Sequence, residues 1–352
     1  MSLELAWFAA LCDDDYEQLG VPDPSLASSY EHCLDIVQTA DRAGFDSILM
    51  PSGYTLGIDT VAFTAAVARQ TERISPIVAV RMGELWPPQL ARQLATLDHL
   101  LQGRMVVNII SSEMPGEQLA SAPRYTRTLE YMQALRTLLN GESLHAAGDF
   151  VHLDVDPPRL RTTSGTCPPL YFGGLSDDAR EVAAAAADVY LMWPDTLDGV
   201  AAIIADMRQR AAAHGRTLRF GYRVHVVVRP TEAEARAAAE QLVAALDPEV
   251  GEAIRARSLD STSVGVRAQA ELRDASDPHG YIEPHLWTGI GRARSGCGAA
   301  IVGDPQQVAD KIRTYQSLGI DTFILSGYPH RRECERFAEL VMPLLRDTTA
   351  TP

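Results

Sequence analysis

Two ionisable side chains stand two residues apart inside an otherwise apolar stretch. The segment GYRVHVVVR (221–229) sets Arg223 and His225 among valines. Side chains two apart on a β-strand share one face, and in a closed barrel that face can be the interior. A buried arginine beside a histidine needs an anionic partner, so the pair predicts an anion-binding site. The alternative is that both side chains face a helix layer and extend their polar ends to solvent.

A second polar group follows the apolar run 322–325. The chain continues as SGYPHRR (326–332), with Tyr328 and His330 ahead of two arginines. A plain turn needs only residues such as glycine, asparagine or serine. Histidine exchanges protons near neutral pH, and a tyrosine hydroxyl can donate or accept a proton. Tyr328 and His330 are therefore candidates for proton handling and anion contact. Arg331 and Arg332 are expected to begin the last helix on its solvent side.

A glycine-rich turn, FGGLSD (172–177), follows a third apolar run and precedes an amphipathic segment. Free backbone N–H groups point outward at the N-terminus of a helix, so Gly174 and Ser176 are suited to an anion such as phosphate. Two adjacent glycines are also common in ordinary tight turns. Both interpretations stay open on this motif alone.

Short apolar runs alternate with longer amphipathic segments along the whole chain. Strands are predicted at 3–9, 47–50, 74–79, 105–110, 169–173, 188–192, 221–228 and 322–325. Helices are predicted at 30–43, 59–71, 88–101, 125–140, 177–186, 197–213, 305–318 and 332–346, with Asp177 as an N-cap and Gly215 ending a helix. This alternation indicates a (β/α)8 TIM barrel. An open Rossmann sheet would need a glycine-rich turn after its first strand, where this chain has Cys12-Asp13-Asp14-Asp15.

The segment from about 247 to 300 interrupts this rhythm. It is polar, broken and rich in Ser, Arg, Gly and Asp. The whole chain, 1–352, is predicted to form one barrel domain with this segment inserted between strands 7 and 8 as an irregular lid, because loops of that length are usually functional. The alternative is a small helical excursion without a role. Arg294, which lies in the segment, is either a lid contact or a solvated loop cation.

Composition excludes several classes of protein. The chain has 352 residues and a formal charge of −15, which opposes binding to nucleic acid or to anionic membranes. No stretch approaches the roughly 18 apolar residues of a membrane span. The odd number of cysteines, 5, without a CxxC pair, and an N-terminus without a signal-peptide pattern favour reduced thiols and a cytoplasmic location. No HExxH or GxSxG motif is present, so neither a metal site nor a serine hydrolase is predicted.

Six sequence blocks, in order, carry a resemblance to a known family. They are ADRAGFDSILMPSG (40–53), ARQLATLDHLLQGRMVVNI (91–109), PPLYFGGLSDDAREVAAAAADVYLMW (168–193), AAAHGRTLRFGYRVHVVVR (211–229), LWTGIGRARSGCGAAIVGD (286–304) and LGIDTFILSGYPH (318–330). The chain resembles the bacterial luciferase-like flavin-dependent monooxygenases, and most closely their alkanesulfonate monooxygenase branch. The match covers nearly the whole length.

The resemblance implies a (β/α)8 barrel that works as the oxygenase component of a two-component system. A separate NAD(P)H-dependent flavin reductase would supply FMNH2, and oxygen would form a flavin peroxide that desulfonates an organosulfur compound to an aldehyde and sulfite. A homodimer or homotetramer is also implied. Carried onto matching positions, the active site would comprise Arg223, His225, Arg294, Tyr328 and His330. The FMN pocket would comprise Asn108, Tyr125, Gly174, Ser176 and Trp193, with Tyr125 and Ser176 near the phosphate and Trp193 as a wall.

Departures from the alkanesulfonate pattern leave the substrate open. Leu56 stands where those enzymes place a cysteine, and Leu175 replaces the first serine of their Gly-Gly-Ser-Ser turn. The acidic loop 12–15 replaces a histidine-containing one, and the segment between Asn108 and Tyr125 is shorter. If the acids point inward, a larger or partly cationic substrate is expected. The alternatives are an F420-dependent oxidoreductase on the same barrel and a non-catalytic flavin-binding protein.

Overall fold

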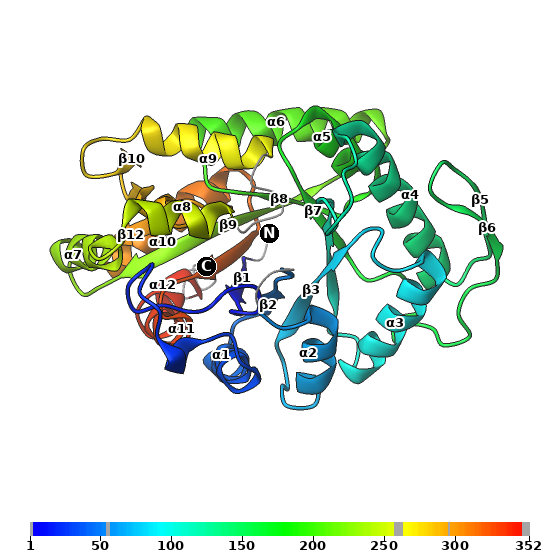
Figure 1. Cartoon of the computed structure of the whole chain (residues 1–352), viewed down its shortest axis with the longest axis horizontal. Coiled ribbons are helices and arrows are strands. Elements are labelled where there is room, and N and C mark those ends of the chain that lie inside the picture. Colours follow the sequence, from blue (N-terminus) through cyan, green and yellow to red (C-terminus); the bar gives the residue numbers. More distant parts are fainter. Residues whose placement is uncertain (1–2, 54–56, 257–262, 295, 347–352) are drawn as a thin grey trace, which may run out of the picture.

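Eight parallel strands close into a barrel in the computed structural model, which describes residues 3–53, 57–256, 263–294 and 296–346 (Figure 1). The strands are β1 (Glu4–Phe8), β2 (Ser47–Met50), β3 (Ser75–Arg81), β4 (Val106–Ile110), β7 (Leu170–Gly173), β8 (Val189–Met192), β9 (Arg219–Val228) and β13 (Thr322–Ser326). Pairing of β9 with both β8 and β13 closes the ring. The predicted barrel is confirmed, and every predicted strand end lies within two residues of the observed one.

Helices surround the barrel (Figure 1). They are α1 (Tyr30–Ala43), α2 (Thr60–Val67), α3 (Pro87–Leu100), α4 (Ser121–Leu139), α5 (Asp177–Ala186), α6 (Leu197–Ala213), α10 (Pro305–Leu318), α11 (His330–Leu340) and α12 (Met342–Arg346), with a short 3-10 turn η1 (Pro24–Leu26). The prediction of Asp177 as an N-cap is wrong. Ser176 caps α5 by accepting the N–H of Ala179 through its hydroxyl, which leaves Asp177 as the first helical residue. Gly215 follows the end of α6 with a φ of 65°, as predicted.

Strand β9 shows how the sheet separates two environments. Tyr222, Val224 and Val226 belong to the main core between the strands and the helices. Arg223 and His225 alternate with them and therefore face the barrel interior. A smaller apolar cluster that includes Ile77 fills the interior. The alternative that the two polar side chains face the helix layer is wrong.

The segment 247–300 is more ordered than predicted. Its described residues form α8 (Pro248–Ala256), α9 (Val264–Asp274), β10 (Tyr281–Glu283), β11 (Leu286–Trp287) and the 3-10 turn η2 (Gly289–Arg292). Strand β12 (Ala300–Gly303) then pairs with the upper half of β9, with Ala300 opposite His225. Three further elements lie outside the predicted pattern: α7 (Glu232–Val243) and the hairpin β5 (Leu144–Ala147) with β6 (His152–Val155). The insertion is thus a small folded unit that continues the sheet at one strand.

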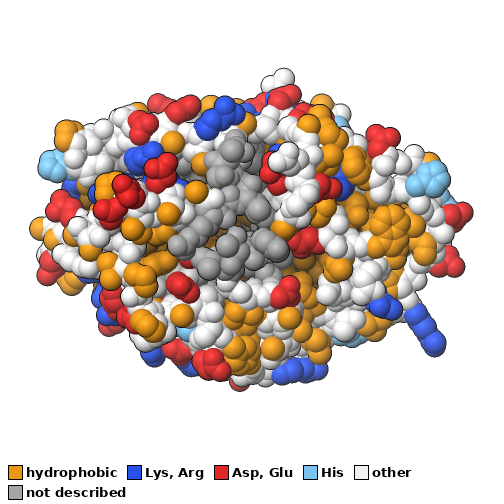
Figure 2. Space-filling view, viewed as in Figure 1, with side chains coloured by type: hydrophobic (Ala, Val, Ile, Leu, Met, Phe, Trp, Pro, Cys, Tyr) orange, Lys and Arg blue, Asp and Glu red, His pale blue; other side chains and the backbone are white. Residues whose placement is uncertain are grey.

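The surface and the thiols agree with the composition. On the face shown in Figure 2, acidic side chains are interspersed with basic ones. All five cysteines are free thiols, as predicted. Among the described residues, no helix is long and apolar enough to span a membrane.

Candidate active site

A cavity of about 680 Å³ opens at the carboxyl ends of the barrel strands. Strand ends and the loops after them form one wall, and α8, α9 and the residues after η2 form the other. Eight of the ten predicted site residues line it: Asn108, Tyr125, Gly174, Ser176, Trp193, Arg223, His225 and Arg294. This is the end at which TIM barrels place their active sites. Tyr328 and His330 lie outside this lining, and the ring of Tyr328 stacks on that of His225 at 5.6 Å between centroids.

Arg223 is a buried cation, 6% exposed, that pairs with no described carboxylate. Its guanidinium donates to the Val224 carbonyl at 3.0 Å and to the Ser326 hydroxyl at 2.7 Å. It also lies 4.4 Å from the centroid of the Phe8 ring. Burial lowers the pKa of Arg223 from its ordinary value, because these neutral partners do not balance its charge. An anionic ligand in the cavity would supply the missing counter-charge.

His225 presents an unpaired nitrogen beside Arg223. Its Nδ1 lies 2.7 Å from the Ser326 hydroxyl, whereas its buried Nε2 has no described hydrogen-bond partner. Burial, and then the charges of Arg223 and Arg294, hold the pKa of His225 well below its ordinary value. His225 is therefore a neutral imidazole at neutral pH, in which one ring nitrogen donates a hydrogen bond and the other accepts one.

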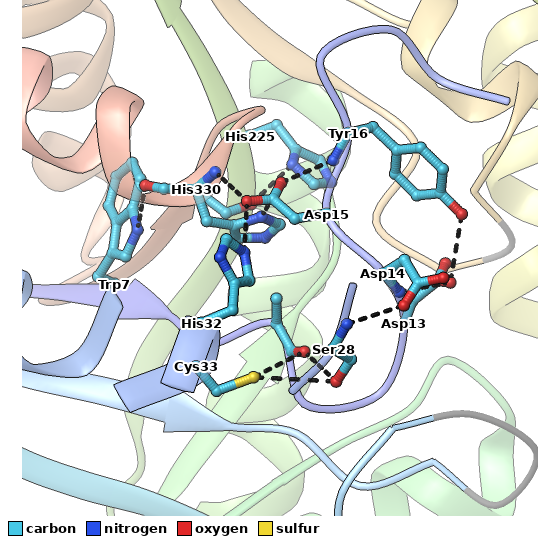
Figure 3. Close-up of polar contacts among 12 residues, drawn as sticks. Trp7, Asp13, Asp14, Asp15, Tyr16, Ser28, His32, Cys33, His225 and His330 are labelled. Atoms are coloured by element: carbon cyan, nitrogen blue, oxygen red, sulfur yellow. Dashed lines mark hydrogen bonds and ion pairs between the residues drawn. The ribbon is translucent and has the colours of Figure 1, made fainter. Parts of the chain in front are cut away.

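The acidic loop after β1 directs its three carboxylates to different partners (Figure 3). Asp13 lines the cavity and accepts Arg294 Nη1 at 2.8 Å through Oδ2. Asp14 instead accepts the Ser28 backbone N–H at 2.8 Å. Asp15 is fully buried under α11. Only one of the three acids lines the cavity, and it is paired, so the reason for expecting a partly cationic substrate is removed.

Asp15 binds His330 at two points. Its oxygens accept the His330 backbone N–H and ring Nδ1, each at 2.8 Å, and His32 Nε2 lies 3.1 Å away (Figure 3). Burial alone would raise the pKa of Asp15, but the charge of His330 and these hydrogen bonds hold it well below the ordinary carboxyl value. An ionised carboxylate only accepts, so Nδ1 of His330 carries its proton. The Nε2 of His330 is buried without a described partner.

Tyr328 connects this group to the cavity-lining residues. Its ring meets the ring of His330 edge-on at 4.8 Å, and the Arg294 guanidinium lies 5.8 Å from its centroid. The hydroxyl is buried without a described partner. Burial raises the pKa of Tyr328 above its ordinary value, so the phenol is neutral at neutral pH. The sequence interpretation of Tyr328 and His330 as two wall residues needs revision, because they lie behind that wall.

The far end of the cavity is suited to a phosphate group. A Cβ added at Gly174 would lie 2.7 Å from the Cβ of Ala179 and 3.6 Å from the Tyr125 hydroxyl, so only glycine leaves this corner open. Arg124, which the sequence interpretation missed, lines the same cavity next to Tyr125 and carries a buried Nε without a described partner. The acids at the start of α5 have other partners, since Asp177 pairs with Arg210. These residues fit the FMN phosphate that the resemblance implies.

Two departures noted in the sequence have different outcomes. Leu175 lines the cavity, so an apolar side chain does stand next to the Gly174 corner. Leu56 lies outside the described residues. The wall on the side of Trp193 is closely packed, because a Cβ added at Gly265 would lie 2.9 Å from the Trp193 ring.

Among the described residues, no group of three or more His, Cys, Asp or Glu side chains could hold a metal ion.

Comparison with known proteins decides the family. The family model for luciferase-like monooxygenases matches residues 7–322. The chain belongs to the luciferase-like monooxygenase family. It is 63% identical to a sulfoquinovose monooxygenase of Novosphingobium aromaticivorans, over 97% of this chain and 96% of that protein. A sulfoquinovose monooxygenase of Agrobacterium fabrum is 51% identical, over 97% of this chain and 90% of that protein.

A solved structure agrees with the fold of the family. The EDTA monooxygenase EmoA from Chelativorans sp. superposes with a TM-score of 0.79 at 19% identity, covering 100% of this chain and 95% of that one. At that identity the likeness concerns the barrel itself. The two sulfoquinovose monooxygenases match this chain over nearly their whole length.

Proposed function

We propose that the chain is the oxygenase component of a two-component flavin-dependent monooxygenase that desulfonates sulfoquinovose, a sulfonated sugar. The observation that carries the proposal is the buried guanidinium of Arg223, which lines the cavity and pairs with no described carboxylate. A sulfonate is an anion whose oxygens match the donor geometry of a guanidinium. The identity of 63% to a sulfoquinovose monooxygenase supports the sugar sulfonate as the substrate.

The cavity separates the binding of substrate from the binding of cofactor. Arg223, His225 and Arg294 would hold the sulfonate. Residues at the other end would hold reduced FMN: Asn108, Tyr125, Gly174, Ser176 and Arg124, with Trp193 as a wall. When bound, the reduced flavin would supply two electrons and activate O2.

The overall reaction balances without another redox partner. The carbon that carries the sulfonate becomes an aldehyde, and the C–S bond breaks with release of sulfite. One oxygen atom of O2 enters the aldehyde and the other leaves as water. The carbon must also lose a proton, and we assign its acceptance to His225 Nε2, in the tautomer in which Nδ1 donates its hydrogen to the Ser326 hydroxyl.

A flavin reductase is the partner that this scheme needs. The free FMNH2 consumed in each turnover would be formed by another protein, the NAD(P)H-dependent flavin reductase that the family resemblance implies. Homodimers or homotetramers remain the expectation from the family resemblance. A cytoplasmic location remains an expectation as well.

Sulfite release tests the proposal. The purified protein would be mixed with sulfoquinovose, FMN, NADH, a flavin reductase and air, and sulfite would be measured. We expect sulfite only when FMN, the reductase and oxygen are all present. If the protein binds FMN but the complete mixture releases no sulfite, the result would favour a non-catalytic flavin-binding protein. Turnover with F420 in place of FMNH2 would favour the F420-dependent alternative.

A further inference from the structure

We propose that Asp13 selects hydroxylated sulfonates by accepting a hydrogen bond from a substrate hydroxyl while Arg294 and Arg223 hold the sulfonate. This inference rests on the proposed function and adds a residue that distinguishes a sugar sulfonate from an alkanesulfonate. Asp13 would make a specificity contact, and it would take no part in the chemical step.

The carboxylate of Asp13 has spare capacity on one oxygen. Its Oδ1 accepts the Asp14 N–H at 2.9 Å and the Tyr16 hydroxyl at 3.5 Å, both within its own loop. Its Oδ2 accepts a single described donor, Arg294 Nη1, at 2.8 Å. A carboxylate oxygen has room for two donors. Asp13 lines the cavity, and the proposal requires that this second position of Oδ2 faces the bound molecule.

The position of Asp13 places this acceptor at the substrate end. Two described carboxylate residues line the cavity, Asp13 and Glu113. Glu113 is 4.0 Å from Arg124, which belongs to the phosphate end. Asp13 instead pairs with Arg294, and the two side chains are only 14% and 17% exposed. A sulfonate held by the arginines would thus bring its carbon chain close to Asp13.

The same contact would act against a plain alkyl chain. A methylene group next to Asp13 would remove water from a carboxylate oxygen without offering a donor in return. Leaving a buried polar group unsatisfied is costly, and sites built around a substrate hydroxyl reject analogues that lack it. A sugar carries hydroxyls along its whole carbon chain and avoids this cost.

The neighbouring acid provides a matched control. Asp14 lies in the same loop, but its carboxylate accepts the Ser28 backbone N–H and is absent from the described lining of the cavity. The variants Asp13→Asn and Asp14→Asn remove one negative charge each from adjacent positions. Only the first alters the contact proposed here.

The test compares two substrates in each protein. Sulfite release from sulfoquinovose and from hexanesulfonate would be measured with FMN, NADH and a reductase, for wild type, Asp13→Asn and Asp14→Asn. We expect Asp13→Asn to lower kcat/KM for sulfoquinovose by about 10- to 100-fold and to leave kcat/KM for hexanesulfonate unchanged or higher. The ratio of the two values is independent of the fraction of folded protein. Asp14→Asn should keep the wild-type ratio.

Two other outcomes would overturn the assignment. An equal loss on both substrates, which leaves the ratio unchanged, would mean that Asp13 acts by positioning Arg294, and wild-type kcat/KM on both substrates in Asp13→Asn would mean that Asp13 contributes to neither. Wild-type protein that releases sulfite from neither compound would overturn the proposed function itself. Wild-type activity with a normal ratio in Asp13→Asn would overturn only the role of Asp13, so the two failures are distinguishable.

Discussion

The carboxylate of Asp15 holds both the backbone N–H and the ring Nδ1 of His330, each at 2.8 Å. An asparagine at this position has a single, uncharged acceptor oxygen, so it cannot accept both His330 N–H groups. Because the ring of Tyr328 lies between His330 and His225, we expect Asp15→Asn to release the ring of His330 and to lower kcat/KM by about 10- to 100-fold, as for the loss of a positioning contact. The 15N NMR shifts of the two ring nitrogens of His330 should change in parallel. Unchanged shifts together with wild-type kcat/KM would contradict the positioning role.

Asp15 also makes stability depend on pH. Its pKa is lower in the folded chain than in the unfolded one. Its contribution is therefore complete above about pH 4, the ordinary carboxyl range, and is lost as the pH falls toward its folded pKa. Wild type should exceed Asp15→Asn in free energy of unfolding by about 3 kcal/mol at pH 7. Urea titrations should show this gap narrowing below pH 4, and a constant gap would argue against the assignment.

Arg223 should be needed for the geometry of its guanidinium, which donates from two nitrogens, as well as for its charge. Lysine retains the charge but cannot reach the Ser326 hydroxyl and the Val224 carbonyl together. We expect Arg223→Lys to lower kcat/KM for the sulfonate by about 10²-fold, and Arg223→Ala to lower it further. Arg331→Ala is the matched control, because Arg331 is 51% exposed on α11 and should retain wild-type sulfite release.

Because His225 is neutral, we expect an unusual dependence of kcat/KM on pH. Because the pKa of His225 lies well below its ordinary value of 6.5, the accepting form persists well below that pH. The profile of kcat/KM should carry no acid limb from His225 near pH 6.5. Comparison with His225→Gln checks this, since a limb near pH 6.5 that disappears in the variant would contradict the expectation.

Arg124 should act on the phosphate of the cofactor alone. Arg124→Ala removes a cation from the corner beside Tyr125 and Gly174. We expect the affinity for FMN to fall by about 10- to 100-fold, as for a lost charge-assisted hydrogen bond. Riboflavin, which lacks the phosphate, should bind wild type and variant equally. Equal weakening of both flavins would mean that Arg124 supports the pocket in some other way.

The barrel was predictable because its strands carry a local signal. Each strand is a short apolar run between amphipathic segments, and that pattern requires no knowledge of distant contacts. Helices α8 and α9 were missed because they lie in a polar, broken segment. The N-cap of α5 was assigned to Asp177 and not to Ser176 because both residue types cap helices well, and the sequence alone does not rank two adjacent candidates.

The sequence predicted which residues belong to the candidate site, but it did not predict most of their contacts. Family blocks pointed to Arg223 and His225, and alternation on β9 placed them inside the barrel. The partners of Asp13 and Asp15 were not predictable. Arg294 and His330 lie far along the chain from that loop, and no spacing rule connects residues so distant in sequence.

The contact between Asp15 and His330 joins residues 315 positions apart. The acidic loop is among the first segments to leave the ribosome, and its histidine partner is among the last. Until His330 arrives, Asp15 is a carboxylate that must stay hydrated, so the loop cannot be buried as it is in the finished barrel. The chain is therefore expected to complete its active site in a late step of folding, when the final strand closes the ring.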